Sequence, residues 1–212
     1  GKQLVPFANS SIPLATIGVF ILWFGWFGFN GGSQLALGTF DDATAVAKIF
    51  INTNLAAAGG VMTCALVTRL IGGKTDVVQM LNGALGGLVA ITAEPLAPVP
   101  FIAIIIGAIG GVVVVAGTAL LVKLKIDDVV GAIPVHMFAG IWGTLAVPLT
   151  NADTNFGAQL IGVLSINVFM FAASFAIWTI LKSTIGIRVS DEAQRKGTDV
   201  AETGVVAYSI RD

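Results

Sequence analysis

The chain has 212 residues and a net charge of −1; 56% of its residues are hydrophobic and only 11% are charged. Soluble domains carry about 25% charged residues, so this composition, with a mean hydropathy of +0.92, excludes an ordinary soluble domain and indicates an integral membrane protein. The near-neutral balance offers no basic surface for nucleic acid. The single cysteine, Cys64, excludes a disulfide within the chain.

Charged residues divide the sequence into six apolar segments. A helix needs roughly 17 to 25 apolar residues to cross the hydrocarbon core, and each segment has about that length. In chain order, the predicted helices cover residues 12–32, 49–70, 77–93, 99–122, 129–150 and 156–181. The period-two alternation of a membrane β-barrel is absent from the sequence. We therefore predict an all-α membrane domain over residues 1–181 and a polar tail over residues 182–212.

The first predicted helix ends in the aromatic run Gly25-Trp-Phe-Gly-Phe-Asn-Gly-Gly-Ser33. Aromatic side chains are enriched where helices meet the membrane surface, and this alone explains Trp26 and Phe27. A second interpretation concerns Phe29 and Ser33, which lie one helical turn apart. A phenyl face attracts a small cation, and a hydroxyl replaces part of its hydration shell. The residues by themselves leave both interpretations open.

Polar and small residues in the next three predicted helices are expected to mediate helix packing. Asn52 and Asn54 fall within residues 49–70, where amide side chains hydrogen-bond between helices. Glycines three or four positions apart share a helix face and let two backbones approach closely. The glycines concerned are Gly83, Gly86, Gly87, Gly107, Gly110, Gly111 and Gly117. We expect them to act in packing only.

His136, the only histidine, lies in the fifth predicted helix, within a stretch that has no formal charge from Val129 to Ala152. Ionisable residues in hydrocarbon usually face a bundle interior, a partner or a permeation path. Counting from Asp128 at about 1.5 Å per residue places His136 about 12 Å into the membrane, near its middle. A neutral imidazole donates one hydrogen bond and accepts another. The alternative is a structural histidine that bridges helices.

The start of this helix has its own signals. Asp127 and Asp128 precede it, and acidic side chains there accept backbone N–H bonds and favour the positive end of the helix dipole. Pro134 is expected to kink the helix near its beginning and so to help aim His136.

The distribution of basic residues predicts the orientation. If Gly1 is cytoplasmic, the outside loops hold only Lys48, whereas the inside loops and tail hold all other basic residues: Lys2, Arg69, Lys74, Lys123, Lys125, Lys182, Arg188, Arg195, Lys196 and Arg211. Cytoplasmic loops are rich in lysine and arginine. The C-terminus is therefore predicted to be cytoplasmic.

Several motifs in order resemble the Amt/Mep/Rh ammonium transporter family. They are GWFGFNGGS (Gly25 to Ser33), FINTNLAAA (Phe50 to Ala58), IDD (Ile126 to Asp128), VHMFAGIWGTL (Val135 to Leu145) and GIRVSDEAQRKGTDVAETGVVAY (Gly186 to Tyr208). Their order and spacing are similar to the C-terminal half of that fold, from its sixth to its eleventh membrane helix. The resemblance covers essentially the whole chain and implies the second inverted repeat of an ammonium-transporter fold plus one further helix.

The resemblance implies roles for particular residues. His136 corresponds to the second of two pore histidines, Phe29 to one of two stacked phenylalanines that form an outer gate, and Ser33 to a hydroxyl of the ammonium recruitment site. Trp26, Asp127 and Asp128 are secondary candidates. The first histidine, the other phenylalanine, and a tryptophan and an aspartate of the recruitment site belong to the family's N-terminal half. This sequence therefore supplies one wall of a pore that forms between two inverted repeats, and by itself would expose Phe29 and His136.

The resemblance also implies partners: ammonium or ammonia as the substrate, a homotrimer in the plasma membrane (the inner membrane in bacteria), and a PII-type signalling protein at the cytoplasmic face. Val205 and Val206 stand where an acidic residue often precedes Ala-Tyr, although Tyr208 matches. An ammonium sensor of the same fold, coupled to signalling, is the alternative function. One histidine and one cysteine provide no metal cluster and no nucleophile–base pair. We therefore expect no enzymatic activity, metal or cofactor.

Overall fold

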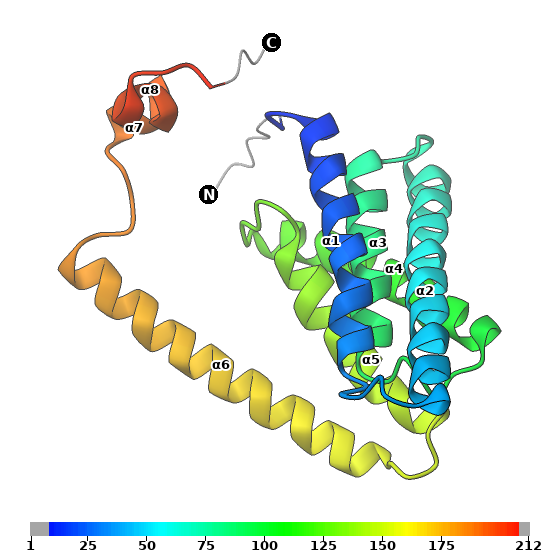
Figure 1. Cartoon of the computed structure of the whole chain (residues 1–212). Coiled ribbons are helices and arrows are strands. Elements are labelled where there is room, and N and C mark those ends of the chain that lie inside the picture. Colours follow the sequence, from blue (N-terminus) through cyan, green and yellow to red (C-terminus); the bar gives the residue numbers. More distant parts are fainter. Residues whose placement is uncertain (1–8, 208–212) are drawn as a thin grey trace. The chain divides into compact units, whose positions relative to one another are not determined.

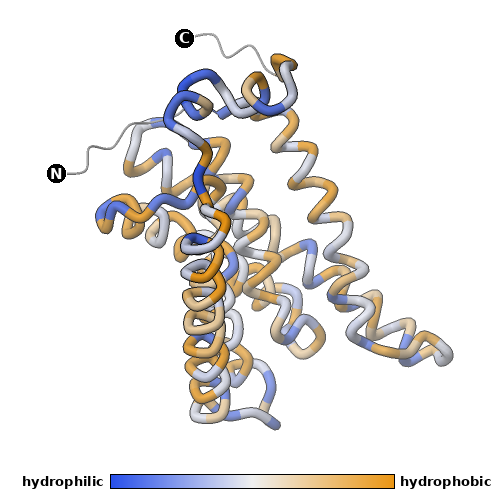
Figure 2. Tube along the Cα trace, turned by 90° about the vertical axis from the view of Figure 1, so that its left-hand side faces the viewer, coloured by the Kyte–Doolittle hydropathy of each residue, from blue (hydrophilic) through white to orange (hydrophobic). Residues whose placement is uncertain are grey.

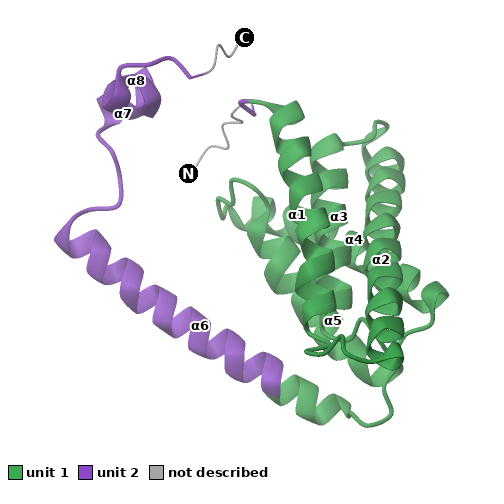
Figure 3. Ribbon diagram, viewed as in Figure 1, with its two compact units in different colours: residues 1–4, 11–161 green, residues 5–10, 162–212 purple. Residues whose placement is uncertain are grey.

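The computed structural model describes residues 9–207, which form helices joined by loops. The described residues fall into two compact units, coloured separately in Figure 3: residues 11–161 form the first, and residues 9–10 with 162–207 form the second. The all-α architecture predicted from the sequence is confirmed for the described residues. Along the chain, hydrophobic residues dominate the helices and hydrophilic residues gather in the loops and the tail (Figure 2).

Four helices form most of the first unit: α1 (Ile12–Gly32), α2 (Phe40–Gly72), α3 (Val77–Thr92) and α4 (Pro100–Leu124). Three of them follow the predicted bounds to within a few residues, but α2 begins at Phe40 rather than at residue 49. The reason is a capping box, in which Thr39 Oγ1 accepts the N–H of Asp42 at 3.1 Å and Asp42 Oδ2 accepts the N–H of Thr39 at 3.1 Å. Hydropathy detects only the apolar part of this helix.

The fifth predicted helix is divided into three pieces. A π-helical turn, η1 (Ile133–Phe138), leads into α5 (Ala139–Ala146) and a short 3₁₀ turn, η2 (Val147–Leu149). Gly131 has φ +77°, so the helix begins after it rather than at residue 129. The kink expected at Pro134 takes the form of a widened turn, because the Ala139 N–H is shared between the carbonyls of Pro134 and His136.

The second unit contains most of α6 (Phe156–Thr184), whose first residues belong to the first unit, and the short tail helices α7 (Asp191–Lys196) and α8 (Thr198–Thr203). Helices α1, α2, α4 and α6 are long and apolar enough to cross a membrane, and α3 and residues 133–149 form shorter apolar helices. In the tail, the backbone N–H groups of Ala207 and Val200 hold the pKa of Asp199 below its ordinary value.

The centre of the first unit is a close-packed bundle of α2, α3 and α4. Gly107 and Gly87 lie against the backbone carbonyl of Ala56, and Gly60 lies against that of Gly83. A Cβ atom at these glycines would meet backbone, which has no side-chain freedom to yield. All seven glycines predicted to act in packing make such close contacts, with backbone or with a side chain.

The remaining elements of the first unit pack around α3. Helix α1 contacts α2 and α3, while η1 and α5 contact α3 and α4. One core cluster joins them: Leu85 and Leu88 of α3 pack with Val135 and Ala139, and the partly buried Trp23 and Trp26 of α1 pack against this cluster. The elements that carry Phe29 and His136 thus converge on α3.

The helices alternate in direction, so the first unit has two ends (Figure 1). We call the end with residues 30–42, 92–100 and 147–155 the Gly32 end, and the end with residues 72–77 and 124–131 the Gly73 end. At the Gly32 end, Asn52 Nδ2 donates to the carbonyls of Pro95 (2.9 Å) and Pro98 (2.8 Å). The side chain of Glu94 accepts from Asn151 Nδ2 at 2.8 Å. These bonds tie the loop between α3 and α4 to α2 and to the loop before α6.

Candidate functional site

The last turns of α1 carry two of the predicted site residues and one secondary candidate. The rings of Trp26 and Phe29 meet edge to face, with centroids 5.8 Å apart and planes inclined by 62°. Phe29 is 64% exposed, so the other described residues leave much of its ring uncovered. The indole of Trp26 donates from Nε1 to Thr92 Oγ1 at 2.8 Å, and Thr92 Oγ1 donates in turn to the carbonyl of Leu88 at 2.6 Å. Trp26 is therefore fixed on α3 while Phe29 stays open.

Ser33 lies directly at the end of α1. It is exposed, it is the C-terminal cap residue, and its hydroxyl donates to the carbonyl of Phe29 at 3.2 Å. This single weak bond leaves the lone pairs of the oxygen available to a ligand. The structure therefore brings Trp26, Phe29 and Ser33 together on one exposed corner of the Gly32 end.

Asn30, between Phe29 and the end of the helix, is 1% exposed. Its Nδ2 donates to Thr53 Oγ1 on α2 at 3.0 Å, and its Oδ1 is buried without a partner among the described residues. Gly31 follows, packed so closely that a Cβ would meet the ring of Phe50. This side of α1 is thus anchored to α2, and the exposed Phe29 lies about 100° from Asn30 around the helix.

His136 lies in η1 and is exposed, whereas its neighbours Pro134 and Val135 are buried. Among the described residues, no group hydrogen-bonds to its imidazole. Pro134 and Phe138 pack against Gly117 of α4, where a Cβ would meet both side chains. The backbone around His136 is therefore packed against the bundle, while the His136 side chain is exposed. The alternative of a histidine that bridges helices finds no partner in the described part of this chain.

Asp128 holds the start of this segment. Its Oδ1 accepts the N–H groups of Gly131 (3.1 Å) and Ala132 (2.9 Å), and its Oδ2 accepts that of Ile133 (2.8 Å). The cap predicted for Asp128 is confirmed, but the cap predicted for Asp127 is wrong, because Asp127 is exposed and accepts none of these bonds. One carboxylate already satisfies the three amides. Asn82 Nδ2 adds a bond to the carbonyl of Val130 at 3.1 Å.

The structure also identifies residues that the sequence did not single out. Thr92, Thr53 and Glu94 supply the partners of Trp26, Asn30 and Asn151. Each lies in a different helix or loop from its partner, and spacing along one segment carries no signal of such a contact. Asn52 does join elements, as predicted for an amide in a membrane helix, whereas Asn54 is exposed.

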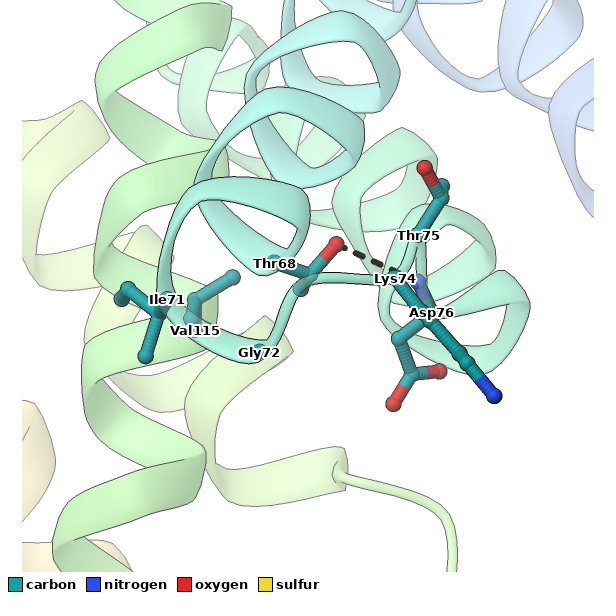
Figure 4. A pocket seen from close by; sticks show the side chains of 7 residues that line it. All are labelled: Thr68, Ile71, Gly72, Lys74, Thr75, Asp76 and Val115. Atoms are coloured by element: carbon teal, nitrogen blue, oxygen red, sulfur yellow. Dashed lines mark hydrogen bonds between the residues drawn. The ribbon is translucent and has the colours of Figure 1, made fainter.

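A pocket lies at the Gly73 end (Figure 4). Its volume is about 480 Å³, and it is lined by Thr68, Ile71, Gly72, Lys74, Thr75, Asp76 and Val115. Thr68 Oγ1 accepts the N–H of Asp76 at 3.2 Å and so closes the turn between α2 and α3. One cationic and one anionic side chain line the pocket, so it favours neither sign of charge. Tyr208, which matched the tail motif, lies outside the described residues.

Comparisons with known proteins identify the family. The model of the Ammonium Transporter Family matches residues 2–208. The ammonium transporter Amt2 of Archaeoglobus fulgidus is 42% identical over 219 residues, which cover 93% of this chain and 46% of Amt2. The ammonium transporter of Bacillus subtilis is 36% identical over 208 residues, covering 91% of this chain and 50% of the relative. The chain therefore spans about half the length of these relatives.

Solved structures agree on the fold. A protein described as a sensor Amt protein superposes with a TM-score of 0.83 at 33% identity, covering 91% of this chain and 49% of that one. Mep2 of Candida albicans superposes with a TM-score of 0.80 at 24% identity, covering 99% of this chain and 53% of Mep2. By the match to the family model over nearly its whole length, this chain belongs to the ammonium transporter family.

Proposed function

We propose that this chain forms half of the conduction path of an ammonium transporter. The observation that carries the proposal is its membership of the ammonium transporter family, with 42% identity to a relative named as an ammonium transporter. The exposed Phe29, Ser33 and His136 support it, because the aromatic face, the hydroxyl and the imidazole are available to a solute.

In this proposal, ammonium is recruited at the Gly32 end. The Phe29 ring attracts the cation, and the Ser33 hydroxyl replaces part of its lost hydration shell. Near Phe29, ammonium gives its proton to water at the outer end, and the ammonia that is formed passes His136. A neutral imidazole accepts a hydrogen bond from ammonia or donates one to it, but it gives a potassium ion no compensation for lost water. Selectivity thus follows from an apolar path that disfavours any ion that cannot lose its charge.

The orientation and assembly are part of the same proposal. The excess of lysine and arginine at the Gly73 end and in the tail supports a cytoplasmic location for both. The Gly32 end then faces the outside, where ammonium is recruited. We place the protein in the plasma membrane, or the inner membrane of a bacterium, as a homotrimer with one pore in each subunit. The membrane domain comprises residues 1–181, and residues 182–212 form a tail that offers a contact to a PII-type protein.

In this proposal, the other inverted repeat of the fold closes the path. Phe29 on α1 is 64% exposed, and His136 is exposed as well. Inverted repeats enclose a transport path at their junction. In this proposal, the surface that carries Phe29 and His136 meets the other repeat.

A sensor is the second candidate, favoured by one observation. A protein described as a sensor Amt protein superposes with a TM-score of 0.83 at 33% identity. A sensor of this fold would use the same recruitment residues but would relay binding rather than pass ammonia.

Uptake of methylammonium into proteoliposomes tests the proposal and separates the two candidates. The full-length protein should accelerate methylammonium uptake relative to protein-free liposomes. Ammonium should inhibit this uptake more strongly than potassium does. Binding of ammonium to the purified protein without any accelerated uptake would favour the sensor. If the protein neither binds ammonium nor accelerates uptake, both candidates are wrong.

A further inference from the structure

The rotation of α1 about its own axis decides where Phe29 and Ser33 point, and hydrophobicity does not set this rotation. Helix α1 is apolar on all sides, with exposed apolar side chains such as Ile17, Phe20 and Phe24. Between helices in a bilayer there is no hydrophobic driving force, because lipid is as apolar as the side chains. Close packing, such as that of Gly31 against Phe50, and specific polar contacts therefore select the rotation.

Two such contacts occur on α1, one turn apart. Trp26 Nε1 donates to Thr92 Oγ1 of α3 at 2.8 Å, and Asn30 Nδ2 donates to Thr53 Oγ1 of α2 at 3.0 Å. Thr53 is fully buried, and Asn30 is 1% exposed. These are the side-chain hydrogen bonds that join α1 to α2 and α3 among the described residues. A donor buried without a partner costs more than the bond itself gains, so each contact strongly disfavours other rotations.

Phe29 lies between these two anchors in the sequence, and its ring rests edge to face on the anchored indole. A turn of the helix by one residue, about 100°, would break both bonds and swing Phe29 and Ser33 away from their present direction. Thr92 Oγ1 also donates to the carbonyl of Leu88, and this bond orients the hydroxyl so that its oxygen accepts from Trp26 Nε1. These two hydrogen bonds thus set the direction of Phe29 and Ser33, although Thr92 and Thr53 do not themselves contact the solute in the proposed path.

We propose that Thr92 and Thr53 are positioning residues of the outer gate, which act by holding Trp26 and Asn30 and so setting the rotation of α1. This inference rests on the proposed function, because it assigns the residues that aim Phe29 and Ser33. It predicts an effect on selectivity and apparent affinity that exceeds any effect on the amount of folded protein.

The test uses near-isosteric changes in the full-length protein. Thr92→Val and Thr53→Val remove one hydroxyl each and keep the side-chain volume, while Thr92→Ser keeps the hydroxyl. Thr118→Val is the matched control, since the Thr118 hydroxyl, also partly buried, donates only within its own helix, to the carbonyl of Val114 at 2.9 Å. Two quantities are measured: methylammonium uptake with potassium as competitor, and the ¹⁹F signal of 5-fluorotryptophan at position 26, assigned by its loss in Trp26→Phe.

Thr92→Val should shift the signal of residue 26 and weaken discrimination against potassium or raise the apparent KM by roughly three- to tenfold, the scale of one hydrogen bond. Thr53→Val should change selectivity in the same direction, and Thr92→Ser and Thr118→Val should behave as wild type. If Thr92→Val shifts the signal while selectivity and KM stay unchanged, although Phe29→Ala alters them, the inference is wrong and the proposed function stands. If Phe29→Ala and Ser33→Ala also leave transport unchanged, the gate itself is wrong.

Discussion

At the scale of single residues, the candidate site consists of side chains that are exposed in an otherwise apolar surface. His136 has no hydrogen-bond partner among the described residues, although imidazole is a costly group to leave unsatisfied in a membrane. Its buried neighbours Pro134 and Val135 show that the backbone itself is well packed. In our proposal, the exposed ring is available to ammonia and faces the other repeat of the fold.

Replacing His136 tests this role directly. His136→Ala removes both the donor and the acceptor and should lower methylammonium uptake by the full-length protein. His136→Asp introduces a carboxylate that attracts cations, so discrimination against potassium should fall. Rates are measured in proteoliposomes at equal amounts of inserted protein. Wild-type rates and selectivity in both variants would show that His136 lies outside the path.

Phe29 and Ser33 are tested by truncation. Phe29→Ala should weaken discrimination against other cations, because the aromatic face is lost. Ser33→Ala should weaken apparent affinity up to roughly tenfold, which corresponds to about 1.4 kcal/mol for one lost hydrogen bond. Apparent KM values for methylammonium, with potassium as competitor, measure both effects. Unchanged affinity and selectivity in the two variants would assign both residues to packing at the membrane surface.

At the scale of elements, the packing of α2, α3 and α4 is set by glycine, and the start of η1 is set by one carboxylate. The contacts of Gly107, Gly87 and Gly60 with neighbouring backbone could be anticipated from the three- and four-residue spacing of glycines. The π-helical turn at residues 133–138 could not, because it depends on how Pro134 packs against Gly117 on another helix. The local sequence predicts that Pro134 disrupts regular helix geometry. The packing against α4 determines that the disruption is a π-helical turn.

Adjacent aspartates give a matched pair for testing the start of η1. Asp128→Ala removes the acceptor of three backbone N–H groups and should lower stability by about 0.5–2 kcal/mol, the range for a lost helix cap. Asp127→Ala removes an exposed carboxylate and should change stability by less than about 0.5 kcal/mol. Thermal unfolding of the purified protein in detergent compares the two variants. Equal destabilisation would mean that the Asp128 bonds do not hold this helix.

At the scale of the whole molecule, the proposed site residues Phe29 and His136 are exposed on the surface of the chain. The exposed aromatic side chains of α1 and the exposed His136 lie on elements that converge on α3. The matched relatives are about twice as long as the region that this chain covers. A transport path between inverted repeats needs both repeats, so one repeat alone leaves the path open on one side.

We therefore expect the 212 residues expressed by themselves not to transport ammonium. Cells that lack ammonium transporters, grown at limiting ammonium, provide the measurement, and insertion of the chain into the membrane is verified separately. The full-length protein serves as the positive control and should restore growth. Restored growth with these residues alone would show that they assemble a path without a second repeat.

The sequence by itself determined the class of the protein and most of its helices. Apolar runs bounded by charges predict membrane helices because hydrocarbon excludes charge, and this holds whatever the helices pack against. It also singled out His136, Phe29 and Ser33, since an ionisable ring in an apolar run and a hydroxyl one turn from a phenyl group are local features.

Only the tertiary structure showed which groups orient α1 and with it Phe29 and Ser33. The bonds from Trp26 to Thr92 and from Asn30 to Thr53 join helices far apart in the chain. No periodicity within one helix predicts them, because a side-chain contact between helices depends on the rotation of both.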